Sequence, residues 1–227
     1  MAAMAMSLKK AVLCAAFLLC WSVGSAMPDE AAERQLIVSA INGNVDGVRQ
    51  ALKNGASINV RDNRGRSALL IATHANNVEM ARVLIAAGAD VNAKDHIEDS
   101  PYLYAGAEGR NEILRMTLEA GADLKSTNRY GGTALIPAAH HGHPETVAIL
   151  LRSRIDKDHV NKLGWTALLE AVILGDGGPT YARIVQMLVK AGANPNIADR
   201  SGVTPLAHAR ARNLTEIAKI LEAAGAR

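Results

Sequence analysis

The sequence predicts an all-α fold, built as a stack of six similar helical units, from two recurring markers. A Gly-Ala-Asp triplet or a near copy begins at Gly55, Gly88 and Gly121, each 33 residues apart, and after one shift of five it returns at Gly192 and Gly225. A second marker, Ser/Thr-Ala/Pro-Leu or a variant of it, keeps the same interval twelve residues later. Such a period is typical of solenoids, in which each unit buries its apolar face against its neighbours.

The unit at residues 62–94 shows the local signals for its two helices. Ser67 is a suitable N-cap, and the apolar run after it predicts a short helix. Asn76-Asn77 breaks that helix, and a second helix follows with apolar residues spaced along one face. Gly88 ends it, because glycine adopts the left-handed conformation without steric cost. A lone pair of this length is marginal in water, so we expect the six pairs to share one core.

Residues 1–26 carry the three features of a secretory signal peptide: a basic start, a short apolar run and small residues before a cleavage site. These features are Lys9-Lys10, Ala11–Trp21 and Gly24-Ser25-Ala26. We therefore expect a mature chain that begins at about Met27. An uncleaved membrane anchor is the first alternative, although the run is short for a bilayer. Lipid attachment at Cys20 is the second, although the bulky Leu19 precedes it.

Removing this segment changes what the composition indicates. Both cysteines, Cys14 and Cys20, lie in it, so the mature chain would have no disulfide, no Cys-based zinc site and no Cys nucleophile. Such a chain suits an oxidising compartment. Without Lys9 and Lys10, 23 basic residues face 22 acidic ones, and the formal net charge falls from +3 to +1. The charge thus gives no indication of nucleic-acid binding.

The repeated residues resemble ankyrin repeats, whose unit runs turn, Thr-Pro-Leu, short helix, Gly-His, longer helix and Gly-Ala-Asp. The resemblance covers about residues 29–227. One departure is the absence of the His that follows the Thr-Pro-Leu triplet, so apolar packing must carry more of the stacking. The resemblance implies six helix-turn-helix units joined by β-hairpin-like turns, with a concave binding face. The predicted units are an N-terminal cap at 27–61, repeats at 62–94, 95–127, 128–160 and 161–198, and a C-terminal cap at 199–227.

The same resemblance places a binding site on the turn tips and the exposed ends of the short helices. Tyr130 and Trp165 stand out, because aromatic residues and Arg dominate binding hot spots. We expect Trp165 to be exposed, and its folding back onto the stack is the alternative. The predicted partner-binding residues are Arg64, Arg66, His74, His96, Arg129, Tyr130, His140, His141, Lys162, Leu163, Trp165 and Arg200.

Other candidate chemistry is weak. His140 and His141 are adjacent and expected to diverge around a helix end, and His143 occupies the Gly-His position, whereas zinc needs three or four convergent ligands. The five-residue insertion at Gly175–Pro179 is glycine-rich but lacks the Lys-Ser or Lys-Thr of a phosphate loop, so we expect a mobile connection. Known catalytic motifs are absent from the sequence. We therefore expect no metal, no cofactor and no enzymatic activity.

The third unit is the least regular of the six. Glu98 stands where a turn glycine is expected. Tyr102 replaces the usual leucine, and we expect it to be buried with its hydroxyl reaching a hydrogen-bond partner.

These observations favour a bacterial periplasmic scaffold that binds another protein. The expected partner is an enzyme of the same compartment, which a monomeric scaffold would inhibit, protect or stabilise through its concave face. Contact with a membrane is expected only through the signal peptide. A secreted effector that binds host proteins through the same face is the alternative.

Overall fold

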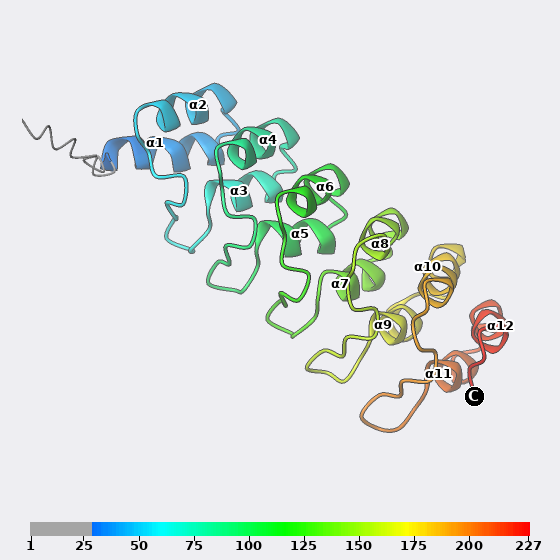
Figure 1. Ribbon diagram of the computed structural model, residues 1–227. Helices are drawn as coiled ribbons and strands as arrows, with labels where there is room; N and C mark the ends of the chain where they lie inside the picture. Colours follow the sequence, from blue (N-terminus) through cyan, green and yellow to red (C-terminus); the bar gives the residue numbers. More distant parts are fainter. Residues whose placement is uncertain (1–28) are drawn as a thin grey trace, which may run out of the picture.

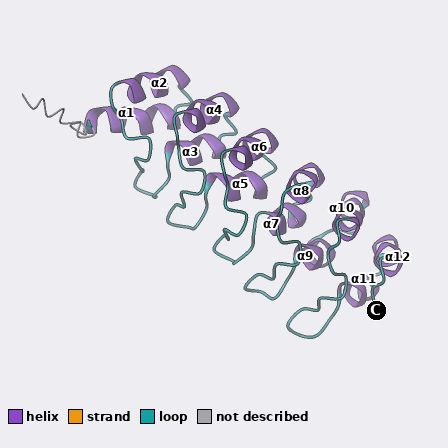
Figure 2. Cartoon of the chain, viewed as in Figure 1, coloured by secondary structure: helices purple, strands orange, loops and turns teal. Residues whose placement is uncertain are grey.

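The chain was analysed as a computed structural model that describes residues 29–227, and the predicted signal peptide and cleavage site lie outside them. The described residues form twelve helices in six consecutive pairs, with no β-strand among them (Figures 1 and 2). The first helix of each pair belongs to an inner row, on the side of the long turns (Figure 1). This row consists of α1 (Glu30–Ile41), α3 (Ala68–His74), α5 (Pro101–Ala107), α7 (Leu135–His140), α9 (Ala167–Leu174) and α11 (Pro205–Ala211).

The second helices form an outer row, and each helix contacts its predecessor and successor in the same row. One apolar core runs through the stack, from Leu36 in the first pair to Leu221 in the last. The predicted all-α stack of six units is therefore confirmed. The outer row consists of α2 (Val45–Lys53), α4 (Val78–Ala86), α6 (Asn111–Glu119), α8 (Pro144–Leu151), α10 (Pro179–Lys190) and α12 (Thr215–Ala223).

Side-chain caps start the inner helices where the sequence predicts them. The Ser67 hydroxyl accepts a hydrogen bond from the Leu70 backbone N–H at 3.1 Å, which satisfies one of the free donors at the start of α3. Ser100, Thr166 and Thr204 make the same bond in later repeats. Each cap of this kind stabilises its helix by about 1 kcal/mol.

The five long turns share one hydrogen-bonded structure. The Asp62 carboxylate accepts from the backbone N–H groups of Arg64 and Arg66, while the Asp62 N–H donates to the Arg66 carbonyl across the turn. Arg61 and Ser67 form an antiparallel bridge at the base of this turn, so its hairpin-like character is confirmed. Equivalent turns begin at Asp95, Asn128, Asn161 and Asp199.

Neighbouring turns are also joined to each other. The Lys162 N–H donates to the Tyr130 carbonyl at 2.9 Å, and the His96 N–H donates to the Arg64 carbonyl at 3.1 Å. Because backbone bonds within and between turns fix them, the tips form a regular row along one side of the stack (Figure 1).

Two expectations for the third repeat have different outcomes. Glu98 has a φ of 65°, so it adopts the left-handed conformation that the turn requires without the glycine that favours it. Tyr102 is fully buried, as expected, but its hydroxyl has no hydrogen-bond partner among the described residues. The prediction of a partner for this hydroxyl is therefore wrong. Burial raises the pKa of the Tyr102 hydroxyl.

The insertion between α9 and α10 is tied to the next repeat. The Arg212 guanidinium donates to the carbonyls of Val172 and Gly175. This bridge holds the start of the loop, which sequence reasoning expected to be a mobile connection.

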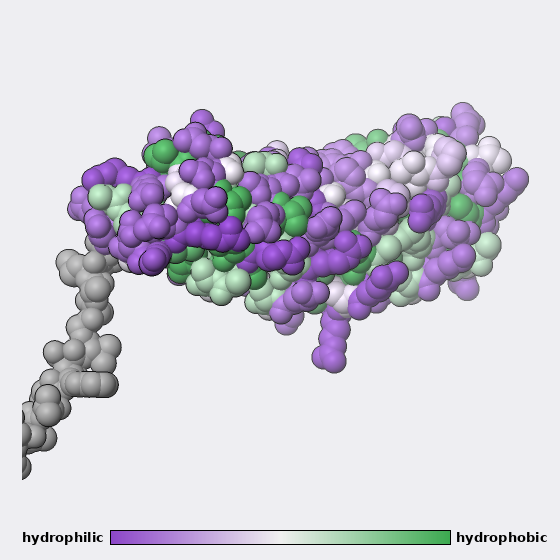
Figure 3. Space-filling model, turned by 90° about the horizontal axis from the view of Figure 1, so that it is seen from above, coloured by the Kyte–Doolittle hydropathy of each residue, from purple (hydrophilic) through white to green (hydrophobic). Residues whose placement is uncertain are grey.

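The face seen from above Figure 1 is mostly hydrophilic, with hydrophobic side chains in small separate groups (Figure 3). No helix among residues 29–227 has the length and hydropathy needed to cross a bilayer.

Candidate functional site

Three exposed apolar residues occupy the same position in three consecutive turns. Ile97, Tyr130 and Leu163 are spaced by 33 residues and are 53%, 54% and 49% exposed. Single exposed apolar side chains need no explanation, but here three of them recur at one repeat position. We call these three residues the tip ladder. Sequence reasoning selected Tyr130 and Leu163, and the backbone bond between Lys162 and Tyr130 brings their turns together.

A groove of about 450 Å³ lies between these turns and the inner helices α5, α7 and α9. This volume falls within the range of small-molecule binding sites, about 300–1,000 Å³. The groove combines apolar and aromatic walls with several ionisable groups. We call it the central groove, and its main lining residues are Asp99, Tyr104, Glu108, Arg129, Tyr130, Ile136, Pro137, His140, His141, Leu163, Glu170 and Leu174.

Glu170 is a buried carboxylate in the central groove, and sequence reasoning missed it. It lies on α9, whose other residues are all apolar, and only 5% of its surface is exposed. The Asn161 amide donates to its Oε1 at 2.9 Å, and His140 Nδ1 lies 3.4 Å from its Oε2. Burial raises the pKa of Glu170 to about 7, against opposing effects of the Asn161 hydrogen bond and of His141. The sequence feature that could have identified Glu170 is a single carboxylate within an otherwise apolar helix.

The prediction that His140 and His141 diverge is wrong. His140 is the last residue of α7 and His141 is its C-cap, so the rings of these two lie 4.8 Å apart between centroids. His141 Nδ1 lies 2.7 Å from the Ala107 carbonyl and 3.7 Å from a Glu108 carboxylate oxygen. Burial, followed by the charge of His141, lowers the pKa of both His140 and His143. Within residues 29–227, no three His, Cys, Asp or Glu side chains gather as a metal site would require.

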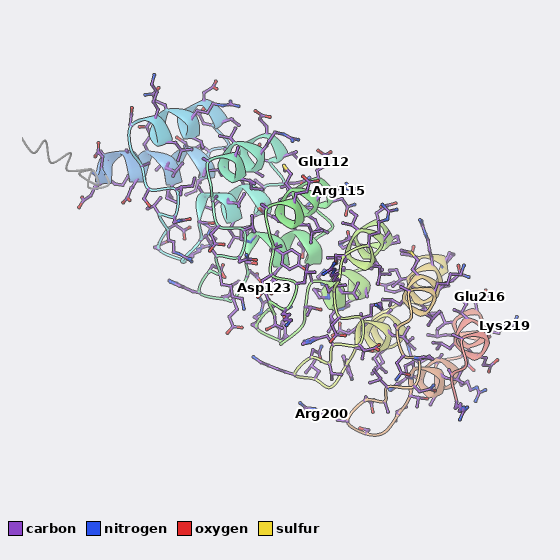
Figure 4. The ribbon with its side chains drawn as sticks, viewed as in Figure 1. Glu112, Arg115, Asp123, Arg200, Glu216 and Lys219 are labelled. Atoms are coloured by element: carbon purple, nitrogen blue, oxygen red, sulfur yellow. The ribbon has the colours of Figure 1, made fainter. Side chains whose placement is uncertain are left out.

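Of the predicted cationic residues on these turns, Arg129 lines the central groove, whereas Lys162 and Arg200 lie outside its lining. The Arg129 guanidinium lies 3.5 Å from the Asp99 carboxylate and 4.9 Å from the centroid of the Tyr130 ring. Lys162 Nζ donates to the Arg129 carbonyl, and Arg200 donates to the Lys162 carbonyl. Arg200 extends from its turn away from the helices (Figure 4). These cations are largely exposed, so they remain available to a partner.

The remaining predicted residues lie outside the central groove. Arg64 and Arg66 line a second groove of about 760 Å³ beside α1, and Arg66 pairs with Asp62 at 2.7 Å. His96 is exposed at its turn tip. His74 stacks on Tyr104 with ring centroids 3.8 Å apart, and burial lowers its pKa.

Trp165 does not have the exposure that sequence reasoning expected. It is half-buried and is absent from the lining of the central groove. The backbone N–H of Trp165 donates to Asn161 Oδ1 within the turn. Its role in partner binding stays a prediction.

The comparisons with known proteins agree on the repeat architecture. The family model for ankyrin repeats in three copies matches residues 3–95 and 102–199. A crystal structure of an ankyrin repeat domain from Acinetobacter baumannii AYE is 59% identical, with a TM-score of 0.83, and the match covers 85% of this chain and 98% of that one. The ankyrin repeat protein EF0377 is 44% identical, with a TM-score of 0.82 and coverage of 84% and 97%.

Two further relatives are less similar or shorter in their match. The ankyrin repeat domain of Bcl-3, described as a unique member of the IkappaB family, is 28% identical with a TM-score of 0.76, covering 85% of this chain and 86% of that one. The ankyrin repeat protein YahD of Escherichia coli K12 is 51% identical over 57 residues. That match spans 25% of this chain and 28% of YahD.

Proposed function

We propose that this chain, which belongs to the ankyrin repeat family, binds an enzyme of the bacterial periplasm through its tip ladder and central groove. The repeats themselves indicate a protein–protein interaction scaffold, and proteins of this family are generally non-enzymatic. By occupying part of the enzyme's surface, the scaffold inhibits, protects or stabilises it.

The tip ladder is the observation that carries this proposal. Three large apolar side chains stand exposed at one repeat position, with Arg129 and Lys162 next to two of them and Glu98 next to the third. An apolar centre with a charged rim is the usual anatomy of a protein interface. The turns that hold the ladder are already ordered by backbone bonds, so association loses little conformational entropy.

The test is a pull-down from periplasmic extract with the full chain as bait. Tyr130→Ser together with Leu163→Ser removes two exposed apolar side chains of the ladder without touching the core. We expect this variant to retain at least tenfold less partner than the unmodified chain, since central apolar anchors dominate interface energies. Arg115→Ala on the outer helix α6 is the control and should retain the partner (Figure 4). Equal retention by the ladder variant would place the interface elsewhere.

The periplasmic location is supported by the basic start, short apolar run and small residues of positions 1–26. Fractionation followed by intact-mass measurement tests it. A periplasmic chain that begins at about Met27 is the expected result. An uncut chain in the membrane fraction, or secretion to the medium as an effector would require, would contradict it.

A further inference from the structure

We propose that the central groove receives an arginine side chain of the partner, carried on an extended segment that crosses the tip ladder. This inference rests on the proposed function and specifies the chemistry that the groove recognises.

The central groove is lined by more carboxylates than guanidinium groups. Asp99, Glu108 and Glu170 contribute three carboxylates, and Arg129 is the one guanidinium among the described lining residues. Arg129 is already engaged with Asp99, at 3.5 Å. His140 Nδ1 faces Glu170 Oε2 at 3.4 Å. Burial lowers the pKa of His140, so its charged form is disfavoured. A partner cation in the groove would compensate the carboxylate that the fold leaves least neutralised.

The walls of the central groove are aromatic and aliphatic. Tyr104 and Tyr130 offer aromatic faces, and Ile136, Leu163 and Leu174 offer aliphatic ones. An arginine side chain has an aliphatic stem that packs on apolar walls and a planar guanidinium that stacks on aromatic rings. The protein already uses this contact once, because the Arg129 guanidinium lies over the Tyr130 ring.

The buried position of the Glu170 carboxylate favours arginine over lysine. Guanidinium is more weakly hydrated than ammonium and presents several donors in one plane, so it enters half-buried sites more readily. The Glu170 carboxylate receives one hydrogen bond from Asn161 and retains acceptor capacity at Oε2. A guanidinium can satisfy that oxygen and still donate to a groove neighbour such as Glu108.

The ladder defines how the segment crosses the stack. The two arms of each turn are hydrogen-bonded to each other, and the turns at Tyr130 and Lys162 are bonded to one another. One repeat is therefore two strand spacings wide, about 10 Å, and the ladder spans about 20 Å. An extended chain in the polyproline II conformation advances about 3.1 Å per residue with three residues per turn, so about seven residues cover the ladder and side chains three apart face successive tips.

The test uses three capped heptapeptides in binding titrations with the full chain. Each has leucine at both ends, and the central residue is arginine, lysine or citrulline, the neutral isostere of arginine. We expect saturable binding of the arginine peptide, with shifts of the Tyr104 and Tyr130 ring signals in NMR spectra. We expect the citrulline peptide to bind at least about tenfold more weakly, because it lacks the charge. The lysine peptide should lie between them.

Glu170→Gln is the decisive variant, because it keeps the shape and the oxygen that accepts from Asn161 while removing the charge. It should weaken the arginine peptide about tenfold and leave the citrulline peptide unchanged. Glu112→Gln on α6 is the matched control and should change neither (Figure 4). Circular dichroism verifies that both variants remain folded.

Equal affinity for the arginine and citrulline peptides, or an arginine affinity that survives Glu170→Gln, would overturn the inference. A partner that is lost with the ladder variant but kept by Glu170→Gln would leave the proposed function standing and reject the arginine site. If the arginine peptide binds as expected but the unmodified chain captures no partner, the arginine site stands and the proposed function is rejected.

Discussion

Replacing Glu170 by Gln should change how the stability of the stack depends on pH. The Glu170 carboxyl is 95% buried, and burial raises its pKa from 4.5 to about 7. The folded chain therefore holds this proton more tightly than the unfolded chain does. Between pH 4.5 and 7 the unfolded chain releases it first, so the free energy of unfolding falls as the pH rises through this window. Above pH 7 the ionised carboxylate remains as a cost to the folded state.

The magnitude follows from the size of the pKa shift. Each pKa unit corresponds to about 1.4 kcal/mol, so the shift gives an upper bound of about 3 kcal/mol. Water in the open groove screens part of this, and we expect about 2 kcal/mol. Glu170→Gln has no proton to lose at this position. Its unfolding free energy relative to that of the unmodified chain should therefore rise by about 2 kcal/mol from pH 4.5 to pH 8.

The assay is urea unfolding followed by far-ultraviolet circular dichroism at half-unit steps of pH. The histidines with lowered pKa values, His74, His140 and His143, act in the opposite direction, because the fold loses their contribution as the pH falls through the region below 6.5. Both proteins contain them, so the contributions of His74 and His143 cancel in the difference between the two curves, which reports Glu170 together with the adjacent His140. Glu112→Gln should give a curve parallel to that of the unmodified chain. Parallel curves for Glu170→Gln as well would refute the reasoning and show that the groove solvates this carboxylate.

Two further substitutions test the irregular third repeat. Tyr102→Phe removes a buried hydroxyl that has no partner among the described residues, so it should raise the unfolding free energy by about 1 kcal/mol in the same urea assay. A clear loss of stability would show that the hydroxyl is hydrogen-bonded. Glu98 has a left-handed backbone conformation, in which a residue with a side chain is strained and glycine is not. Glu98→Gly should therefore raise the free energy of unfolding by about 0.5–1 kcal/mol in thermal melts, after the greater freedom of glycine in the unfolded chain is included. A lower melting temperature would mean that the Glu98 side chain makes a compensating contact.

The fold was predictable from the sequence because its determinants are local and repeated. The capping hydroxyl of Ser67 and the left-handed glycine at Gly88 each act within a few residues, and they recur with one period. The repeat register also identified the exposed tip residues Tyr130 and Leu163, because exposure at a turn tip follows from position alone.

The chemistry of the groove was less predictable, because it depends on side chains from different repeats. Glu170 is 33 residues from Pro137 and lies in a helix whose other residues are apolar. Its contacts with His140 and Asn161 therefore become visible only once the repeats are stacked. The expected exposure of Trp165 was wrong for a related reason. The register fixes its backbone in the turn, but the direction of a large side chain depends on the surfaces around it.

The groove is nevertheless built from few repeat positions. Each position supplies lining residues from two or three successive repeats, always 33 apart: Tyr130 and Leu163, then Tyr104, Pro137 and Glu170, then Glu108, His141 and Leu174. By contrast, the turn position that caps the backbone is always Asp or Asn, from Asp62 to Asp199. Stacking therefore constrains the capping position and leaves the lining positions free to differ. A partner that fits the groove must match residues on three repeats at once, which favours an extended protein segment over a small ligand.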